Sequence, residues 1–264
     1  HDLFRSGKLT WRFRAENVRD AAVSIARTYL WDATHAVVAR GADGAPRTCE
    51  IHAVYEKNSG DWTRAAEYAR HTIEWMSEQV YPYPWPHMTA CEGIIGGGME
   101  YPMLTMITGY RGPQSLASVI AHELAHQWFY GMVGNNETQE AWMDEGFAQF
   151  MTEEVMRNAL FSLQGSPYTG LDAMIYPWDD HPWHDVESTY GLTVGGFIEP
   201  LSTFHDWHSD GRTAGEVYYK GLAVLRMMRG MVGDSLFNHG LRTYVSRWRY
   251  RHPGYRDFEK VMED

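Results

Sequence analysis

Two histidines separated by three residues, with a glutamate directly after the first, are the strongest chemical signal in this 264-residue chain. They lie in the sequence HELAH at 122–126, inside a segment with helical periodicity. Because residues at i and i+4 share one face of a helix, the imidazoles of His122 and His126 can bind one metal ion. Imidazole is a good zinc ligand, and Glu123 can reach a water on the metal rather than the metal itself. The motif suggests a zinc-dependent hydrolase, although two surface histidines on a helix would give the same pattern.

A third metal ligand is expected at Glu145, which eighteen residues separate from His126. It lies in the apolar sequence AWMDEGFAQF, where a carboxylate has little structural purpose. Two helices joined by a short loop pack antiparallel, which can bring Glu145 to the two histidines. Three nitrogen and oxygen ligands leave a fourth position open for water, as in hydrolytic rather than structural zinc sites. We therefore expect one zinc ion per chain, held by His122, His126 and Glu145.

The elements that position these residues are predicted from apolar periodicity and from capping and breaking residues. Helices are predicted at 62–80, 115–132, 141–160, 216–231, 234–249 and near 255. Strands are predicted at 9–14, 36–39, 49–55, 88–92 and 101–108. The segment 165–215 has no sustained period and is expected to contain short helices. This pattern indicates an α+β fold, with a small mixed sheet near the N-terminus followed by a mainly helical region that carries the metal ligands.

Composition excludes several classes of partner. The 23 basic and 34 acidic residues give a formal net charge of −11, so a nucleic-acid partner is not expected. No apolar run is long enough to span a bilayer, and the first residues lack the apolar stretch of a secretory signal, so the compartment stays open. Cys49 and Cys91 are expected to be buried thiols rather than a disulfide, because a core of this size does not depend on a crosslink.

Four motifs follow one another along the chain: GGGMEYP at 96–102, HELAHQWF at 122–129, WMDEGFA at 142–148 and VYYKG at 217–221. In this order they resemble the aminopeptidase N family of zinc metallopeptidases, the gluzincins that include leukotriene hydrolase. The sequence AENVRDAAVSIA at 15–26 also resembles the end of that family's β-rich N-terminal domain. The resemblance implies a thermolysin-like catalytic domain at 47–264, with the tail of the β-rich domain and a junction at 1–46. It also implies that most of the N-terminal domain and the helical C-terminal domain are absent from this chain.

The resemblance implies that the first motif binds substrate. Glu100 would hold the free α-ammonium group of a peptide, so that only the first peptide bond reaches the metal. Gly97, Gly98 and Met99 would let the backbone approach the substrate as an edge strand does. Without the resemblance, the glycines are a flexible turn and Glu100 is a charge at a strand edge.

The resemblance also implies the catalytic groups. Tyr218 would donate a hydrogen bond to the developing oxyanion, while the neighbouring Tyr219 packs. Glu123 would act as general base towards a zinc-activated water. Without the resemblance, both tyrosines fit the core face of a helix. The predicted function is a zinc-dependent aminopeptidase that hydrolyses the N-terminal peptide bond of peptides with a free N-terminus.

Two residues depart from the family's usual motifs. Tyr101 stands where Asn commonly follows the motif's Glu, and it could narrow or redirect the pocket for the first side chain. Asp144 stands where Asn commonly precedes the third ligand, and like Gln149 it could support the ligands from behind. Two other functions stay open: a catalytically silent binding module with a peptidase fold, and a thermolysin-type endopeptidase, which would need neither Glu100 nor a free amine.

Overall fold

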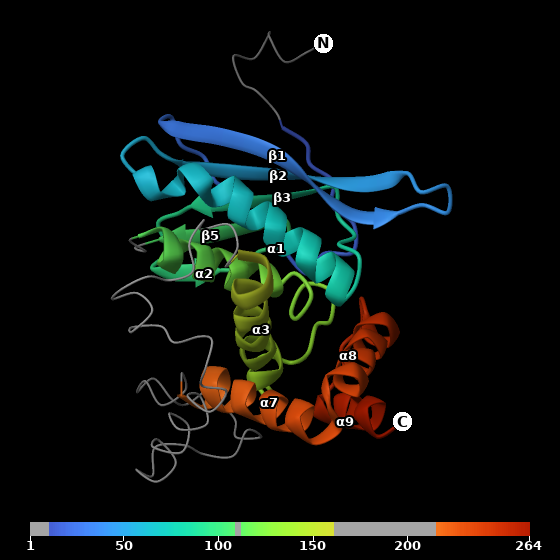
Figure 1. Ribbon diagram of the computed structural model, residues 1–264. Coiled ribbons are helices and arrows are strands. Elements are labelled where there is room, and N and C mark those ends of the chain that lie inside the picture. Colours follow the sequence, from blue (N-terminus) through green and yellow to red (C-terminus); the bar gives the residue numbers. More distant parts are fainter. Residues whose placement is uncertain (1–10, 109–111, 161–214) are drawn as a thin grey trace.

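The structure, a computed structural model, describes residues 11–108, 112–160 and 215–264 (Figure 1). Its single described sheet has the strand order β1-β2-β3-β5-β4. The strands are β1 (Tyr29–Arg40), β2 (Pro46–Glu56), β3 (His87–Glu92), β4 (Gly97–Met99) and β5 (Leu104–Thr108). β2, β3 and β5 run parallel, whereas β1 and β4 pair antiparallel with their neighbours. The predicted mixed sheet and the α+β class are therefore confirmed.

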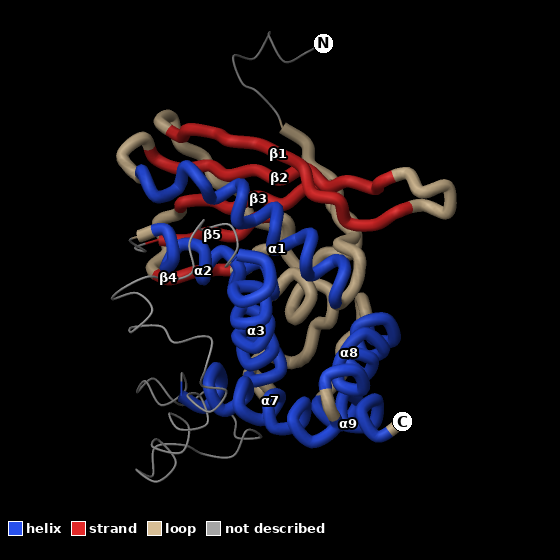
Figure 2. Tube along the Cα trace, viewed as in Figure 1, coloured by secondary structure: helices blue, strands red, loops and turns tan. Residues whose placement is uncertain are grey.

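The helical part follows the sheet in the chain. The α-helices are α1 (Ala65–Gln79), α2 (Pro113–Ala125), α3 (Trp142–Val155), α7 (Gly221–Val232), α8 (Asp234–Trp248) and α9 (Tyr255–Glu263). A 3₁₀ turn, η1 (Gly60–Arg64), precedes α1, and π-helical turns occur at η2 (Met156–Leu160) and η5 (Gly215–Lys220). Strands gather at one end of the molecule and α7, α8 and α9 at the other, with α3 between them (Figure 2). No described helix could cross a membrane.

The sheet is stabilised by one apolar face that packs on α1. In β2, alternate residues are buried, among them Cys49, Ile51 and Tyr55, because successive side chains of a strand point to opposite faces. α1 packs on β1 and β2 and buries Ile73 and Met76 completely. Cys49 and Cys91 are buried free thiols, as predicted.

Most predicted elements are confirmed, but their ends differ. The helix predicted at 115–132 ends at Ala125, because the amides of Gln127 and Trp128 bond to carbonyls three residues earlier and Tyr130 has a φ of 129°. The glycines predicted as a connecting segment include strand β4. The short strand predicted at 36–39 is the end of the longer β1, and residues 11–14 are not in a strand.

The strand pair β1/β2 spans the junction expected near residue 46. The division into a tail at 1–46 and a catalytic domain at 47–264 stays a prediction. The short helices expected at 165–215 fall almost wholly outside the described residues.

Candidate active site

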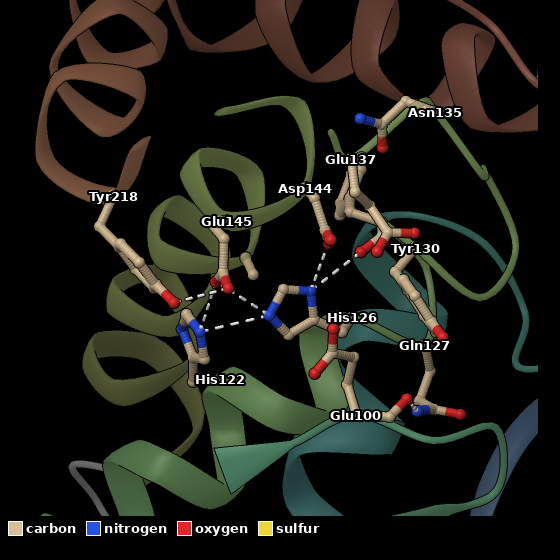
Figure 3. Close-up of polar contacts among 12 residues, drawn as sticks. Glu100, His122, His126, Gln127, Tyr130, Asn135, Glu137, Asp144, Glu145 and Tyr218 are labelled. Carbon is tan, nitrogen blue, oxygen red and sulfur yellow. Dashed lines mark hydrogen bonds and ion pairs between the residues drawn. The ribbon is translucent and has the colours of Figure 1, made fainter. Parts of the chain in front are cut away.

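The structure brings the three predicted metal ligands together. His122 lies in the last turn of α2, His126 caps that helix, and Glu145 lies in the first turn of α3, which packs on α2. The Nε2 atoms of the two histidines are 3.3 Å apart. Glu145 Oε2 lies 3.1 Å from His122 Nε2 and 3.2 Å from His126 Nε2. Figure 3 shows the three side chains pointing to one place.

The other nitrogen of each imidazole has a partner of its own. His126 Nδ1 lies 2.6 Å from the buried carboxylate of Asp144. His122 Nδ1 lies 3.3 Å from the hydroxyl of Thr152, which donates its own hydrogen to the carbonyl of Ala148 and so can accept one from the ring. Both Nδ1 hydrogens are thereby directed away from the site. The two Nε2 atoms are left to face Glu145, which is the donor set and the tautomer that a zinc ion requires.

The charges around this point also suit a cation. Burial lowers the pKa of His122. Burial opposes the charged form of His126 too, but Asp144 and Glu145 outweigh it and raise the pKa of His126 well above its usual range. Burial alone would raise the pKa of Glu145, yet the two imidazoles hold that pKa below its usual range. In the metal-free chain a proton on His126 therefore balances the carboxylates, and a metal ion would replace that proton.

Glu123 faces the same place from α2. It is buried, and no described residue forms a hydrogen bond with its Oε2. Burial raises the pKa of Glu123 to about 8. It lies close to two other side chains: one carboxylate oxygen of Glu123, one of Glu100 and one imidazole nitrogen of His126 are all within 4.8 Å of one another. A buried carboxyl group that no described residue binds, beside a predicted metal site, is placed to act on a water or a substrate.

The glycine motif forms the wall opposite α2. Gly98 lies so close to Glu123 that a Cβ at position 98 would come 1.8 Å from Glu123 Oε1. Gly97 has a φ of 91°, which favours glycine. Both glycines belong to β4, the last strand of the sheet, which pairs only with β5 among the described strands. Met99 does not line the cavity, and its carbonyl accepts a hydrogen bond from Thr105.

Tyr218 reaches the site from η5. Its hydroxyl donates a hydrogen bond of 2.6 Å to Glu145 Oε1, and its ring stacks on His122 with 5.8 Å between centroids. Burial, and then the charge of Glu145, raises the pKa of Tyr218. Tyr219 is not part of the cavity lining and is 43% exposed. Of the two tyrosines, only Tyr218 therefore lines the cavity that holds the predicted metal site.

These groups surround a cavity of about 430 Å³, a volume suited to part of a peptide. Its lining comprises Glu100, Glu123, Tyr218, Gly97, Gly98, the three ligand residues, Thr152 and also Gly96, Ser118, Val119 and Gln149. Tyr101 is not part of the lining.

Comparison with known proteins decides the family. Residues 64–264 match the family model described as "Peptidase family M1 domain". The chain belongs to peptidase family M1. The four motifs predicted a member of the aminopeptidase N family of zinc metallopeptidases, and this prediction is confirmed.

Relatives of this M1 chain are aminopeptidases by name. "Aminopeptidase M1-B" of Oryza sativa subsp. japonica is 26% identical over 203 residues, which cover 70% of this chain and 21% of the relative. "Aminopeptidase B" of Homo sapiens is 29% identical over 168 residues, which cover 59% of this chain and 23% of the relative. The M1 chain therefore spans about a fifth of the length of these relatives. Together with the family, they support the predicted class of enzyme, a metallopeptidase.

A solved structure shows the same fold. The M1 zinc metallopeptidase from Deinococcus radiodurans superposes with a TM-score of 0.63 at 20% identity. The superposition covers 89% of the M1 chain and 48% of that protein. The zinc in the name of that protein agrees with the cofactor predicted here.

Sequence reasoning missed two side chains of this site. Thr152 was overlooked, although its position seven residues after Glu145 places it on the same face of α3. Gln127 was overlooked as well, although a polar residue inside the apolar run after His126 is a signal in itself. Asp144, which the sequence analysis singled out, lies against His126.

Proposed function

We propose that this M1 chain is the catalytic part of a zinc-dependent aminopeptidase, which hydrolyses the N-terminal peptide bond of peptides. The observation that carries the proposal is the convergence of His122, His126 and Glu145 in a cavity that Glu100 also lines. Two ligands come from the end of one helix and the third from the start of the next, which supports the thermolysin-like arrangement expected from the sequence. One zinc ion per chain would be held there.

Zinc, when bound, supplies a Lewis acid that polarises a carbonyl oxygen and lowers the pKa of water. Glu123 takes the proton of the attacking water and later gives it to the leaving amine. Its Oε2 is free for this step because no described residue binds it. In the metal-free chain burial raises the pKa of Glu123 to about 8, and a cation bound beside it would lower that pKa towards the range in which the carboxylate accepts a proton at neutral pH.

Glu100 binds the α-ammonium group of the peptide. The carboxylate is largely buried, so an ion pair formed there is shielded from water and stronger than at the surface. The proximity of Glu100 to Glu123 and His126 leaves room for little more than one residue before the bond that is cut. Gly97, Gly98 and Met99 present the edge of β4 to that residue.

Tyr218 stabilises the oxyanion. Its hydroxyl lies within hydrogen-bond distance of Glu145 and must turn from that carboxylate to the oxyanion during the reaction. A phenol donor in a buried site contributes roughly 3 kcal/mol to such a step.

This chain spans about a fifth of the length of the relatives it matches. We assign residues 1–46 to the tail of the β-rich domain and its junction, and residues 47–264 to the catalytic domain. The short coverage of the relatives fits the proposal of further domains in the same polypeptide, of which the family resemblance implies a helical C-terminal one. The partner of the site is a peptide with a free N-terminus.

The two other functions are less well supported. A silent binding module would not need the complete set of ligands, general base and oxyanion donor that converge here. A thermolysin-type endopeptidase would not need a carboxylate at position 100 in the cavity.

The test uses the zinc-loaded chain with leucine p-nitroanilide and its N-acetyl derivative. We expect hydrolysis of the free amine only, and loss of hydrolysis with a chelator. Glu123→Gln should keep zinc and lose turnover by about 10²- to 10⁴-fold. Glu145→Ala should lose both zinc and turnover. Equal hydrolysis of the acetylated compound would favour the endopeptidase, and zinc binding without any hydrolysis would favour the binding module.

A further inference from the structure

Gln127 connects the metal site to the segment that carries Glu100. It follows the ligand His126 directly and is completely buried. Its amide nitrogen donates to the carbonyls of Tyr101 (3.2 Å) and Glu100 (3.4 Å). Its amide oxygen accepts from the backbone N–H of Met103 at 3.0 Å. All described hydrogen bonds of this side chain therefore go to one four-residue segment, 100–103.

Apart from Gln127, this segment is held by backbone hydrogen bonds from the N–H of Thr89 to the carbonyl of Met103 and from the N–H of Leu104 to the carbonyl of Tyr101, neither of which involves Glu100. It joins β4 to β5 and is strained, since Met103 has a φ of 62°. Within the described residues, no hydrogen bond or ion pair holds the carboxylate of Glu100. The position of that carboxylate therefore depends on the backbone of 100–103, and Gln127 binds that backbone at three points.

We propose that Gln127 is a positioning residue, whose amide holds segment 100–103 against the end of α2 and so sets the distance between the amine-binding Glu100 and the metal ligands. The proposal rests on the proposed function and extends it to the origin of selectivity for a free N-terminus. The ammonium group must reach Glu100 while the scissile carbonyl reaches the metal, so an error of about 1 Å in this distance weakens binding of the free amine. Ligands without an ammonium group do not depend on it.

The chemistry of the glutamine explains why this residue suits the task. A primary amide has two donor hydrogens and one acceptor oxygen on a rigid plane, which matches two carbonyls and one N–H of a tight turn. Methionine has the same length but neither donor nor strong acceptor. Glutamate keeps the acceptor for Met103 and loses both donors.

The experiment measures affinity rather than turnover, using leucine hydroxamate and N-acetyl-leucine hydroxamate on the zinc-loaded full chain. Both compounds bind zinc through the hydroxamate, and only the first has an ammonium group. We expect the wild type to prefer the free amine. In Gln127→Met that preference should fall by about tenfold, equivalent to ~1.4 kcal/mol, through weaker binding of the free amine alone. Zinc affinity and binding of the acetyl compound should stay unchanged.

Three further variants complete the test. Gln127→Glu should lose the same preference and serves if the methionine variant does not fold. Gln139→Met makes the same chemical change at an exposed residue and should keep the wild-type preference. Glu100→Gln removes the amine-binding carboxylate itself and so gives the lowest preference for the free amine that the Gln127 variants can reach.

The results separate this proposal from the proposed function. If the wild type prefers the free amine and both Gln127 variants keep that preference, whether at full affinity or with the affinity for both compounds reduced by the same factor, the positioning role is wrong and the aminopeptidase proposal stands. If the wild type shows no preference for the free amine, both proposals fail.

Discussion

Glu123 is the residue whose environment most changes its chemistry. Its pKa rises from 4.5 to about 8 because it is buried, so the folded metal-free chain binds this proton more tightly than the unfolded chain. The resulting stabilisation is complete below pH 4.5 and is lost as the pH rises through about 8. Glu123→Gln removes this dependence.

We therefore expect Glu123→Gln to become more stable than the wild type as the pH rises from 4.5 to about 8, by up to about 1.4 kcal/mol for each unit of pKa shift. The measurement is urea unfolding of both proteins at several pH values in the presence of a chelator. If the free energies of unfolding of the two proteins change in parallel with pH, the pKa of Glu123 is not shifted by folding.

The side chains that contact the Nδ1 atoms of the two histidines should differ in how much they contribute to metal affinity. Asp144 is an acid that lies 2.6 Å from His126, whereas Thr152 has a hydroxyl group that does not ionise and lies 3.3 Å from His122. Such partners fix the ring and raise its basicity, and their loss costs about 10- to 100-fold in metal affinity. We expect the loss of zinc affinity to approach about 100-fold in Asp144→Asn and about 10-fold in Thr152→Val.

Competition for zinc with a chromophoric chelator measures both affinities. Thr152→Ser keeps the hydroxyl and is the matched control, with an affinity expected within about twofold of the wild type. A larger loss in Thr152→Val than in Asp144→Asn would contradict the ranking.

The approach of His122 to His126 could be predicted from the sequence because a helix fixes the relation of i to i+4 without further information. The contacts of Gln127 and Thr152 could not, because they depend on where a segment far away in the chain packs. Met99, which the motif placed with the substrate-binding residues, is not among the described lining residues, and its part in presenting the edge of β4 stays a prediction.

At the scale of the elements, the crossing of α3 and α7 brings Tyr218 to the metal site. The helices touch through their backbones: a Cβ on Gly146 would lie 2.9 Å from Gly221 Cα. Gly146 follows the ligand Glu145, and Gly221 lies one turn after Tyr218. Gly146→Ala should force the helices apart and destabilise the chain by about 1–3 kcal/mol.

Gly230→Ala is the matched control. Gly230 lies in α7, the helix of Gly221, and is exposed. Apart from its chain neighbours and the backbone of its own helix, no described atom would lie within 4 Å of a Cβ added there. Removing a glycine at this position should stabilise the helix by roughly 0.5–1 kcal/mol. Thermal unfolding measures both changes, and a Gly146→Ala chain as stable as Gly230→Ala would show that the crossing tolerates separation.

Element types were easier to predict than their ends. α1, α3, α8 and α9 have apolar residues at helical spacing, so their burial follows the sequence. The end of α2 at Ala125 and the strand β4 are set by tertiary contacts, because a positive φ at Tyr130 and pairing with β5 have no local signature.

At the scale of the whole molecule, the site lies where the sheet meets the helices. β4 contributes one wall, α2 and α3 the metal ligands, and η5 the phenol, so the cavity exists only when sheet and helices are packed together. The α+β class was predictable from the order of the elements. The closure of the site was implied by the family resemblance and not by any local pattern.

The two buried thiols can be used to test whether the sheet and the helices open together. Cys49 in β2 and Cys91 in β3 are at most 1% exposed, and burial raises the pKa of Cys49 to about 12. Iodoacetamide should therefore label neither thiol until the sheet opens. We expect zinc to bind the folded chain through the predicted site, so a zinc concentration 100 times Kd should slow labelling of both thiols by about 100-fold if the molecule opens as one unit.

Glu145→Gln removes a ligand and should abolish that protection, although position 145 lies in α3 and both thiols lie in the sheet. Mass spectrometry of the labelled chain follows each cysteine separately. Protection of both thiols in the wild type, and of neither in the variant, requires that the sheet cannot open while α2 and α3 are held by the ion. Labelling that ignores zinc in the wild type would mean that the sheet opens independently, and the metal site would then stabilise only its own helices.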